Sequence, residues 1–181
     1  MTCVAYRDGV MASDSRCSDE YDMHLTNCRK IFRLKNGALL GSAGDDDDRT
    51  IRELLSKASP RKMPTREQLA ATKTTYSAIM VFPKGQVYVV SVGVREYDHD
   101  SVWDGSVSAI TDPFVAVGSG QQYAYGAMEH GASAQEAVRT ACKRDLHCAL
   151  PLQWESVDGR SRSVPDVKAG KTTATPGPRK S

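Results

Sequence analysis

Short apolar runs separated by turn residues dominate the first half of the chain. Residues 3–6 and 10–12 flank Asp8-Gly9, a dipeptide typical of two-residue hairpin turns. An Asn-Gly pair marks a second such turn further along the chain. Runs of this length, flanked by turn signals, predict strands rather than helices. The other predicted strands span residues 25–34, 38–44, 76–82, 86–92, 113–118 and 150–157.

Apolar residues at helical spacing follow the early strands and return near the end. Ile51, Leu54 and Leu55 fall on one helical face. Ser133 and Glu136 have the spacing of a capping box, which marks the start of a helix. The predicted helices span residues 49–55, 65–74, 121–130 and 133–145.

Two segments allow more than one interpretation. Four consecutive aspartates, Asp45–Asp48, precede the first predicted helix, where carboxylates can cap free N–H groups and complement the helix dipole. A metal site is the alternative, but adjacent side chains point in different directions, so capping is favoured. Residues 93–112 are polar with isolated apolar side chains, and we expect a loop or ragged strands there.

Composition narrows the class of protein. A chain of 181 residues with 40% hydrophobic and 25% charged residues suits one domain with its own core. The net charge of +2 is too small to argue for nucleic acid, and no stretch approaches the roughly 20 apolar residues of a membrane span. The five cysteines form no CxxC pair, and the start lacks a signal-peptide pattern, so we expect a cytoplasmic protein with reduced thiols, without metal or cofactor.

The end of the sequence differs in composition from the rest. Residues 160–181 consist mainly of Ser, Thr, Pro, Gly, Lys and Arg, with almost nothing apolar to offset the entropy of ordering. We therefore expect a domain over residues 2–157 and a disordered basic tail over residues 160–181. An arm for an anionic partner is a weaker alternative, because the basic residues of the tail are sparse.

Thr2, directly behind Met1, is the first candidate for chemistry. Loss of Met1 would leave one residue with both a hydroxyl nucleophile and a free α-amine that can act as its base. An unperturbed α-amine has a pKa of about 8, and a nearby cation would lower it. A small residue at position 2 is also common for processing reasons alone, so Thr2 needs support from the rest of the chain.

That support comes from a series of motifs in a particular order. They are Asp14-Ser15-Arg16, Lys30–Leu34, Gly41–Gly44, Gly118-Ser119-Gly120 and Arg144-Asp145. From Thr2 to about Val157 the chain resembles the N-terminal nucleophile hydrolases of the proteasome β-subunit type. It is most similar to short bacterial and phage proteasome-like proteins and to HslV, the peptidase of a bacterial ATP-dependent protease.

The resemblance implies an α+β fold, a four-layer αββα sandwich of two antiparallel sheets. It also implies a site in which Lys30 acts on the amine of Thr2, Asp14 pairs with Lys30, and the backbone N–H of Gly44 serves an oxyanion hole. Arg16 would give structural support. Ser119 would bond near the amine, supported by Asp145. Taken singly, these residues also suit ordinary roles as surface charge, turn cap or tight turn.

The chain departs from the family pattern in two ways. The region after Asp48 has room for about one and a half helices instead of two long ones, so we expect a reduced helical layer on one face. Cys148 stands where a supporting hydroxyl is usual, and a thiol is a weaker donor. A dyad of Cys148 with His147 is disfavoured, because adjacent side chains rarely face each other.

The function implied by the resemblance is that of a threonine-type endopeptidase, which hydrolyses peptides or unfolded proteins through an acyl-enzyme on Thr2. Assembly into a homo-oligomeric ring and an ATP-dependent unfoldase as partner would follow from the same resemblance. The alternative is a proteasome-fold shell or interaction protein without activity.

Overall fold

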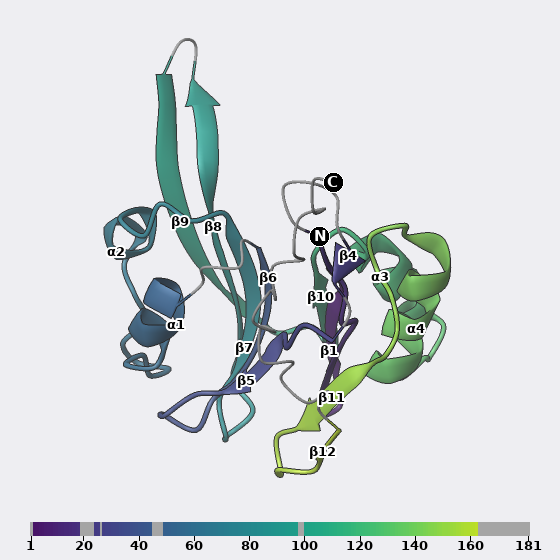
Figure 1. Cartoon of the computed structure of the whole chain (residues 1–181). Helices are drawn as coiled ribbons and strands as arrows, with labels where there is room; N and C mark the ends of the chain where they lie inside the picture. The colour runs from purple at the N-terminus through teal and green to yellow at the C-terminus, as the bar shows by residue number, and fades with distance from the viewer. Residues whose placement is uncertain (1, 19–23, 26, 45–48, 98–99, 163–181) are drawn as a thin grey trace, which may run out of the picture.

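A computed structural model describes residues 2–18, 24–25, 27–44, 49–97 and 100–162. The four consecutive aspartates and residues 163–181 of the expected tail lie outside this part of the chain. Within it, the chain forms two five-stranded antiparallel sheets that face each other, with helices on their outer faces (Figure 1). This is the α+β, four-layer αββα arrangement expected from the sequence.

The first sheet is built on the N-terminal hairpin. In this hairpin Asp8 and Gly9 both have positive φ values, 49° and 78°, which suits the tight turn predicted for this dipeptide. Val4 pairs with both Ser13 and Val117, so the first strand lies at the centre of three. In order across the sheet, the strands are β10 (Phe114–Val117), β1 (Val4–Arg7), β2 (Val10–Ser13), β11 (Gln153–Ser156) and β12 (Ser161–Arg162).

The second sheet follows the order of the chain. Its strands are β5 (Ile31–Arg33), β6 (Leu39–Gly44), β7 (Tyr76–Val81), β8 (Val87–Tyr97) and β9 (Asp100–Ile110). The strand expected at residues 25–34 is shorter than predicted, because only its last part joins this sheet. Its first residue belongs to β4 (His24–Leu25), which pairs with β3 (Cys17–Ser18).

The two helical layers differ in size. On the first sheet lie α3 (Gln121–Glu129) and α4 (Ala134–Arg144), and the capping box predicted at Ser133 and Glu136 is present. Among the residues that the structure describes, the second sheet carries only the seven-residue α1 (Arg49–Leu55) and the five-residue α2 (Arg66–Ala70). The expected reduction of one helical layer is therefore confirmed. None of the helices in the described ranges is long and apolar enough to cross a membrane.

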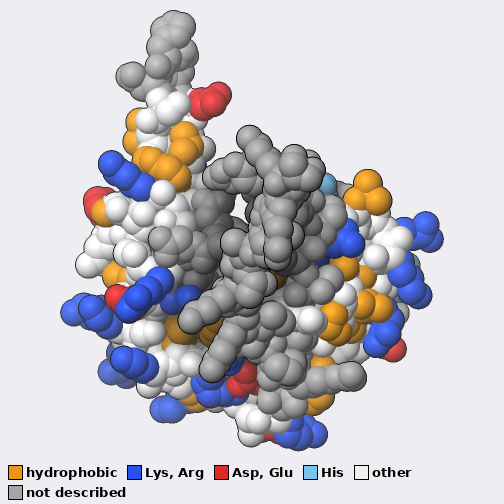
Figure 2. Space-filling view, in the orientation of Figure 1, with side chains coloured by type: hydrophobic (Ala, Val, Ile, Leu, Met, Phe, Trp, Pro, Cys, Tyr) orange, Lys and Arg blue, Asp and Glu red, His pale blue; other side chains and the backbone are white. Residues whose placement is uncertain are grey.

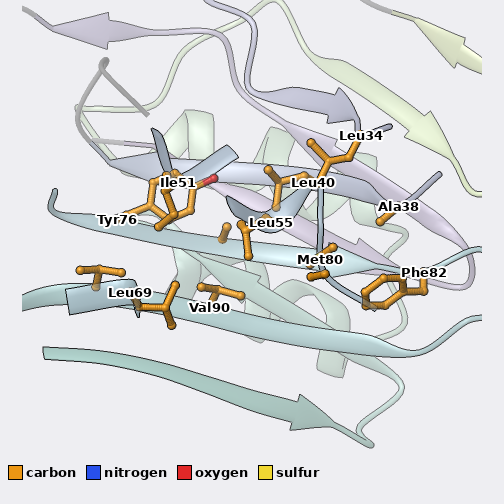
Figure 3. Close-up of a cluster of buried hydrophobic side chains, with 13 residues drawn as sticks. Leu34, Ala38, Leu40, Ile51, Leu55, Leu69, Tyr76, Met80, Phe82 and Val90 are labelled. Atoms are coloured by element: carbon orange, nitrogen blue, oxygen red, sulfur yellow. The ribbon is translucent and has the colours of Figure 1, made fainter. Parts of the chain in front are cut away.

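Three apolar clusters separate the four layers. Ile51 and Leu55 of α1 and Leu69 of α2 pack on the outer face of the second sheet, against residues such as Met80 and Val90 (Figure 3). A second cluster joins α3 and α4 to the first sheet. The third fills the space between the sheets and contains Val4, Met11, Leu39, Ile79 and Val115. This central core fixes the two sheets against each other, and with them the residues at their ends.

The prediction of a loop or ragged strands over residues 93–112 is wrong. Strands β8 and β9 form one continuous hairpin that projects beyond the other layers (Figure 1). Polar residues of the kind that suggested a loop form ion pairs on these strands, since Asp104 accepts from both Arg66 and Arg95. Figure 2 shows hydrophobic side chains on the projecting part, where Val94 and Val102 are 48% and 51% exposed.

Candidate active site

Asp14 directly follows β2 and is fully buried. Its Oδ1 accepts from the Lys30 Nζ at 2.8 Å and from the backbone N–H of Cys3 at 3.0 Å. Its Oδ2 accepts from the backbone N–H groups of Arg16 at 3.0 Å and Ala149 at 3.2 Å. One carboxylate thus binds four donors from four parts of the chain, which is what a buried charge requires.

Lys30 directly precedes β5 and is 5% exposed, so its ammonium is held inside the protein. Asp14 and Lys30 come from different sheets, and their ion pair crosses the space between them. The backbone carbonyl of Lys30 accepts from the N–H of Ser42 on β6 at 3.0 Å, which ties its position to the second sheet. The expected pairing of Lys30 with Asp14 is present in the structure.

Thr2 lies at the entry to β1 and is 4% exposed. Its carbonyl accepts from the backbone N–H of Gly120 at 3.3 Å and from the Ser119 hydroxyl at 3.4 Å. Gly118 approaches so closely that a Cβ there would lie 2.8 Å from the Thr2 carbonyl carbon, and its φ of 96° favours glycine. The loop between β10 and α3 is therefore shaped to lie against Thr2.

Asp145 ends α4, on the side of the first sheet that carries both longer helices. Its Oδ1 accepts from the backbone N–H of His147 at 2.8 Å, and its Oδ2 from the Cys148 thiol at 3.4 Å. Burial acts to raise the pKa of Asp145, but these hydrogen bonds and one with Ser119 hold the pKa below its usual value. Asp145 and Ser119 are thus brought together beside Thr2.

Cys148 occupies the position where the resemblance calls for a hydroxyl. Burial is the main cause that raises the pKa of the Cys148 thiol far above its ordinary value, and the nearby negative charge of Asp14 is the next. The group therefore stays protonated at neutral pH and can donate its S–H to Asp145. A protonated, 3% exposed thiol is also a poor nucleophile, which argues against a reactive role for Cys148.

Gly44 is the last residue of β6 and is exposed, unlike the other predicted site residues of the two sheets. A Cβ at Gly44 would collide with the Thr75 carbonyl oxygen and would lie 2.9 Å from the Tyr76 Cα, so β7 passes too close for a side chain. The preceding residue, Ala43, lies near Gly118 in the loop that contacts Thr2. The β-carbon of Ala43 lies 3.3 Å from the position that a Cβ would take on Gly118.

Gln153 was missed by sequence reasoning. Its side chain is 1% exposed and contacts both members of the ion pair through their backbones. Strand alternation places Gln153 on the same face as Glu155. A charged residue on that face suggests that the face is exposed to solvent. In the structure that face points toward the second sheet, where Glu155 pairs with Arg33 at the edge. A glutamine beside an acidic residue gave no signal of burial.

An open pocket of about 350 Å³ adjoins the Thr2 region. It connects the Ser119 loop with the end of α4, and so offers room for part of a ligand next to the residues that contact Thr2. Its lining includes Ser119, Gln122, Tyr123, Arg144, Asp145 and His147. Within the described residues, no group of three or more His, Cys, Asp or Glu side chains could hold a metal ion.

Comparison with known proteins identifies the family. A family model described as proteasome subunit matches residues 1–146, a span that contains Thr2, the buried ion pair and Asp145. A search of curated protein sequences gave no match. The matched span covers most of the 181 residues and agrees with the two facing antiparallel sheets. The chain therefore belongs to the proteasome subunit family.

Proposed function

We propose that this protein is a threonine-type N-terminal nucleophile hydrolase that cleaves peptide bonds. The observation that carries the proposal is the buried pair of Asp14 and Lys30, 2.8 Å apart. The same Asp14 oxygen accepts from the N–H of Cys3, the residue bonded to the Thr2 carbonyl. This oxygen therefore links the cation to the backbone of the proposed nucleophile.

The proposed reaction has two steps. With Met1 removed, the Thr2 hydroxyl attacks the scissile carbonyl, the Thr2 amine takes the hydroxyl proton, and the proton passes to the leaving amine. Water then attacks the ester on Thr2 and releases the carboxylic acid, which restores the hydroxyl. The Lys30 ammonium favours the neutral form of the amine, because two nearby cations repel each other.

The other residues have supporting roles in this proposal. The backbone N–H of Gly44 donates to the oxyanion formed during attack. Ser119 and Asp145, beside Thr2, form a hydrogen-bonded group that holds the free amine once Met1 is gone. No metal or organic cofactor takes part, since the base is supplied by the nucleophile's own residue.

Hydrolysis of a set of fluorogenic peptides by matched variants tests the proposal. Thr2→Ala should fold and be inactive, since it lacks the hydroxyl, whereas Thr2→Ser should retain activity. Lys30→Ala should also be inactive, because the amine loses the cation that keeps it neutral. Hydrolysis by Thr2→Ala at the wild-type rate would refute the proposed nucleophile, and substantial turnover by Lys30→Ala would remove Lys30 from the mechanism.

A proteasome-fold shell or interaction protein without activity is the second candidate. The burial of Thr2, at 4% exposure, favours it, because a nucleophile must be reached by substrate. A chain that keeps Met1 has an amide nitrogen at Thr2, which does not accept a proton near neutral pH. A preparation with Met1 retained and without hydrolysis of any peptide would support this candidate.

We further propose that copies of the chain assemble into a homo-oligomeric ring and that unfolded protein reaches the ring through an ATP-dependent unfoldase. Membership of the proteasome subunit family supports this proposal. The five free cysteines suit a reducing, cytoplasmic compartment. Native mass spectrometry tests assembly, since a monomer at all concentrations would contradict a ring.

A further inference from the structure

Gln153 spans the space between the two sheets beside the proposed catalytic pair. It belongs to β11, where it pairs with Ser13 in the first sheet. Its side chain extends toward Lys30 at the start of β5 in the second sheet. At 1% exposure, a primary amide has to find all its partners within the protein.

The amide of Gln153 has a partner for each of its polar groups. Its Oε1 accepts from the backbone N–H of Lys30 at 3.0 Å. Its Nε2 donates to the backbone carbonyl of Asp14 at 3.3 Å and to that of Cys28. If the amide were flipped, its NH₂ group would face the N–H of Lys30 and its oxygen would face two carbonyl oxygens. The partners therefore fix the orientation of the amide.

These contacts hold the backbones of the two residues whose side chains form the ion pair. Asp14 is attached to the first sheet, Lys30 to the second, and Gln153 binds both. The distance between the two backbones limits where the Lys30 ammonium can lie while it stays on Asp14. Replacing the Gln153 amide therefore removes these backbone contacts without removing any charge from the site.

We propose that Gln153 is a positioning residue of the active site, which places the Lys30 ammonium through hydrogen bonds to the Lys30 and Asp14 backbones. This inference rests on the proposed threonine hydrolase function. Its consequence is electrostatic. At an effective dielectric constant of about 20, moving a cation from about 5 to about 6 Å away raises an amine's pKa by about 0.4.

Two substitutions at Gln153 distinguish the effect of moving the Lys30 ammonium from the effect of adding a charge beside it. Gln153→Met has a similar size but makes none of the three hydrogen bonds, so the ammonium can move away from the Thr2 amine. Gln153→Glu keeps an acceptor for the Lys30 N–H but adds a negative charge that faces two carbonyls. That charge favours the protonated amine, so the effect of Gln153→Glu on the pH profile should be the larger of the two.

The test measures the rate at which a β-lactone acylates Thr2 between pH 5 and pH 9, together with the melting temperature. Gln153→Met should react about 2- to 3-fold more slowly at pH values below the pKa of the amine, with the acidic limb of the profile moved to higher pH by about 0.4. Gln153→Glu should move it further. The exposed control Gln86→Met should match the wild type.

The outcomes separate this inference from the proposed function. A wild-type protein that is not acylated at Thr2 would overturn the proposed function and the role of Gln153 with it. A reactive wild type and Gln153 variants that melt earlier but keep the wild-type rate and pH profile would overturn only the positioning role. Should Gln153→Met fail to fold, the uncharged Gln153→Asn, whose shorter side chain cannot span the Lys30 and Asp14 backbones, takes its place, and a wild-type rate and pH profile for that variant would overturn the positioning role.

Discussion

At the scale of single residues, the site depends on backbone donors as much as on side chains. Asp14 accepts from three backbone N–H groups in addition to the Lys30 ammonium. A carboxylate held by several N–H groups keeps its position even when substrate or solvent disturbs one partner. The ammonium is therefore bound to a fixed anion rather than to a mobile side chain.

The carboxyl of Asp145 should make stability depend on acid pH. Hydrogen bonds hold its pKa below the usual value in the folded protein, so its ionised form stabilises the fold above about pH 4. This stabilisation is lost as the pH falls through the folded-state pKa. The difference in free energy of unfolding between wild type and Asp145→Asn should be largest at pH 7 and shrink below about pH 4.

Urea unfolding at several pH values from 7 to 3 measures this difference. Asp112→Asn, at an exposed position, serves as the control and should follow the wild-type curve. An Asp145→Asn protein whose deficit stays constant over the whole range would show that the carboxylate charge is not what matters there.

Sequence reasoning located the side chains of the site better than their environment. The motif around Asp14 and the position of Lys30 were recognisable from the resemblance, and the structure pairs them. The donors from Cys3 and Ala149 carry no side-chain signal, because any residue other than proline supplies a backbone N–H. Gln153 was missed because strand alternation alone does not say which face of a strand is covered by another layer.

At the scale of elements, the β8–β9 hairpin is the clearest difference from expectation. Its polar residues suggested a loop, yet the pairing runs without interruption from Val87↔Ile110 to Tyr97↔Asp100. A ladder of backbone hydrogen bonds does not depend on side-chain polarity, and α2 covers part of β9. The strands that a core buries on at least one face, such as β1 and β7, were predicted with nearly correct bounds.

Gly105 on β9 should be essential for the packing of α2. A Cβ at this position would collide with the Cβ of Leu69 and lie 3.2 Å from the Arg66 carbonyl oxygen. Gly105→Ala should therefore push α2 outward and reduce the free energy of unfolding by about 1–3 kcal/mol. Urea unfolding measures the loss.

Gly93 offers a matched control in the same hairpin, since a Cβ there would meet nothing within 4 Å. Gly93→Ala should keep or slightly raise the stability, because alanine loses less conformational entropy on folding. Equal effects of the two substitutions would contradict the close contact between α2 and β9.

At the scale of the whole molecule, the central core between the sheets sets the relative position of the site residues. Thr2 and Asp14 belong to the first sheet and Lys30 to the second, so a shift of one sheet would separate them. Two of the polar links between the sheets, Gln153 and the Asp14–Lys30 pair, lie among buried residues. Their geometry therefore depends on the packing of the core as a whole.

The expected boundary between domain and tail can be tested by truncation. Residues 163–181 are almost without apolar side chains, so their removal should leave the melting temperature unchanged. Removal of residues 160–181 also deletes β12 and the Arg160 carbonyl, which accepts from the N–H of Ser156 at 2.8 Å. That truncation should cost about 1–3 kcal/mol.

Thermal unfolding of both truncated proteins distinguishes the two effects. A large loss of stability on removing residues 163–181 alone would show that this segment packs against the domain. Equal melting temperatures for both truncations would show that β12 contributes nothing to the fold.

The most direct test of the account is the mass and site of the adduct that a β-lactone forms with the purified protein. The proposed mechanism requires a chain that lacks Met1 and carries one acyl group on Thr2, with no adduct on Thr2→Ala. Peptide mapping by mass spectrometry locates the group. Retention of Met1 in a preparation that still cleaves peptides at full rate, or acylation of a residue other than Thr2, would contradict the account.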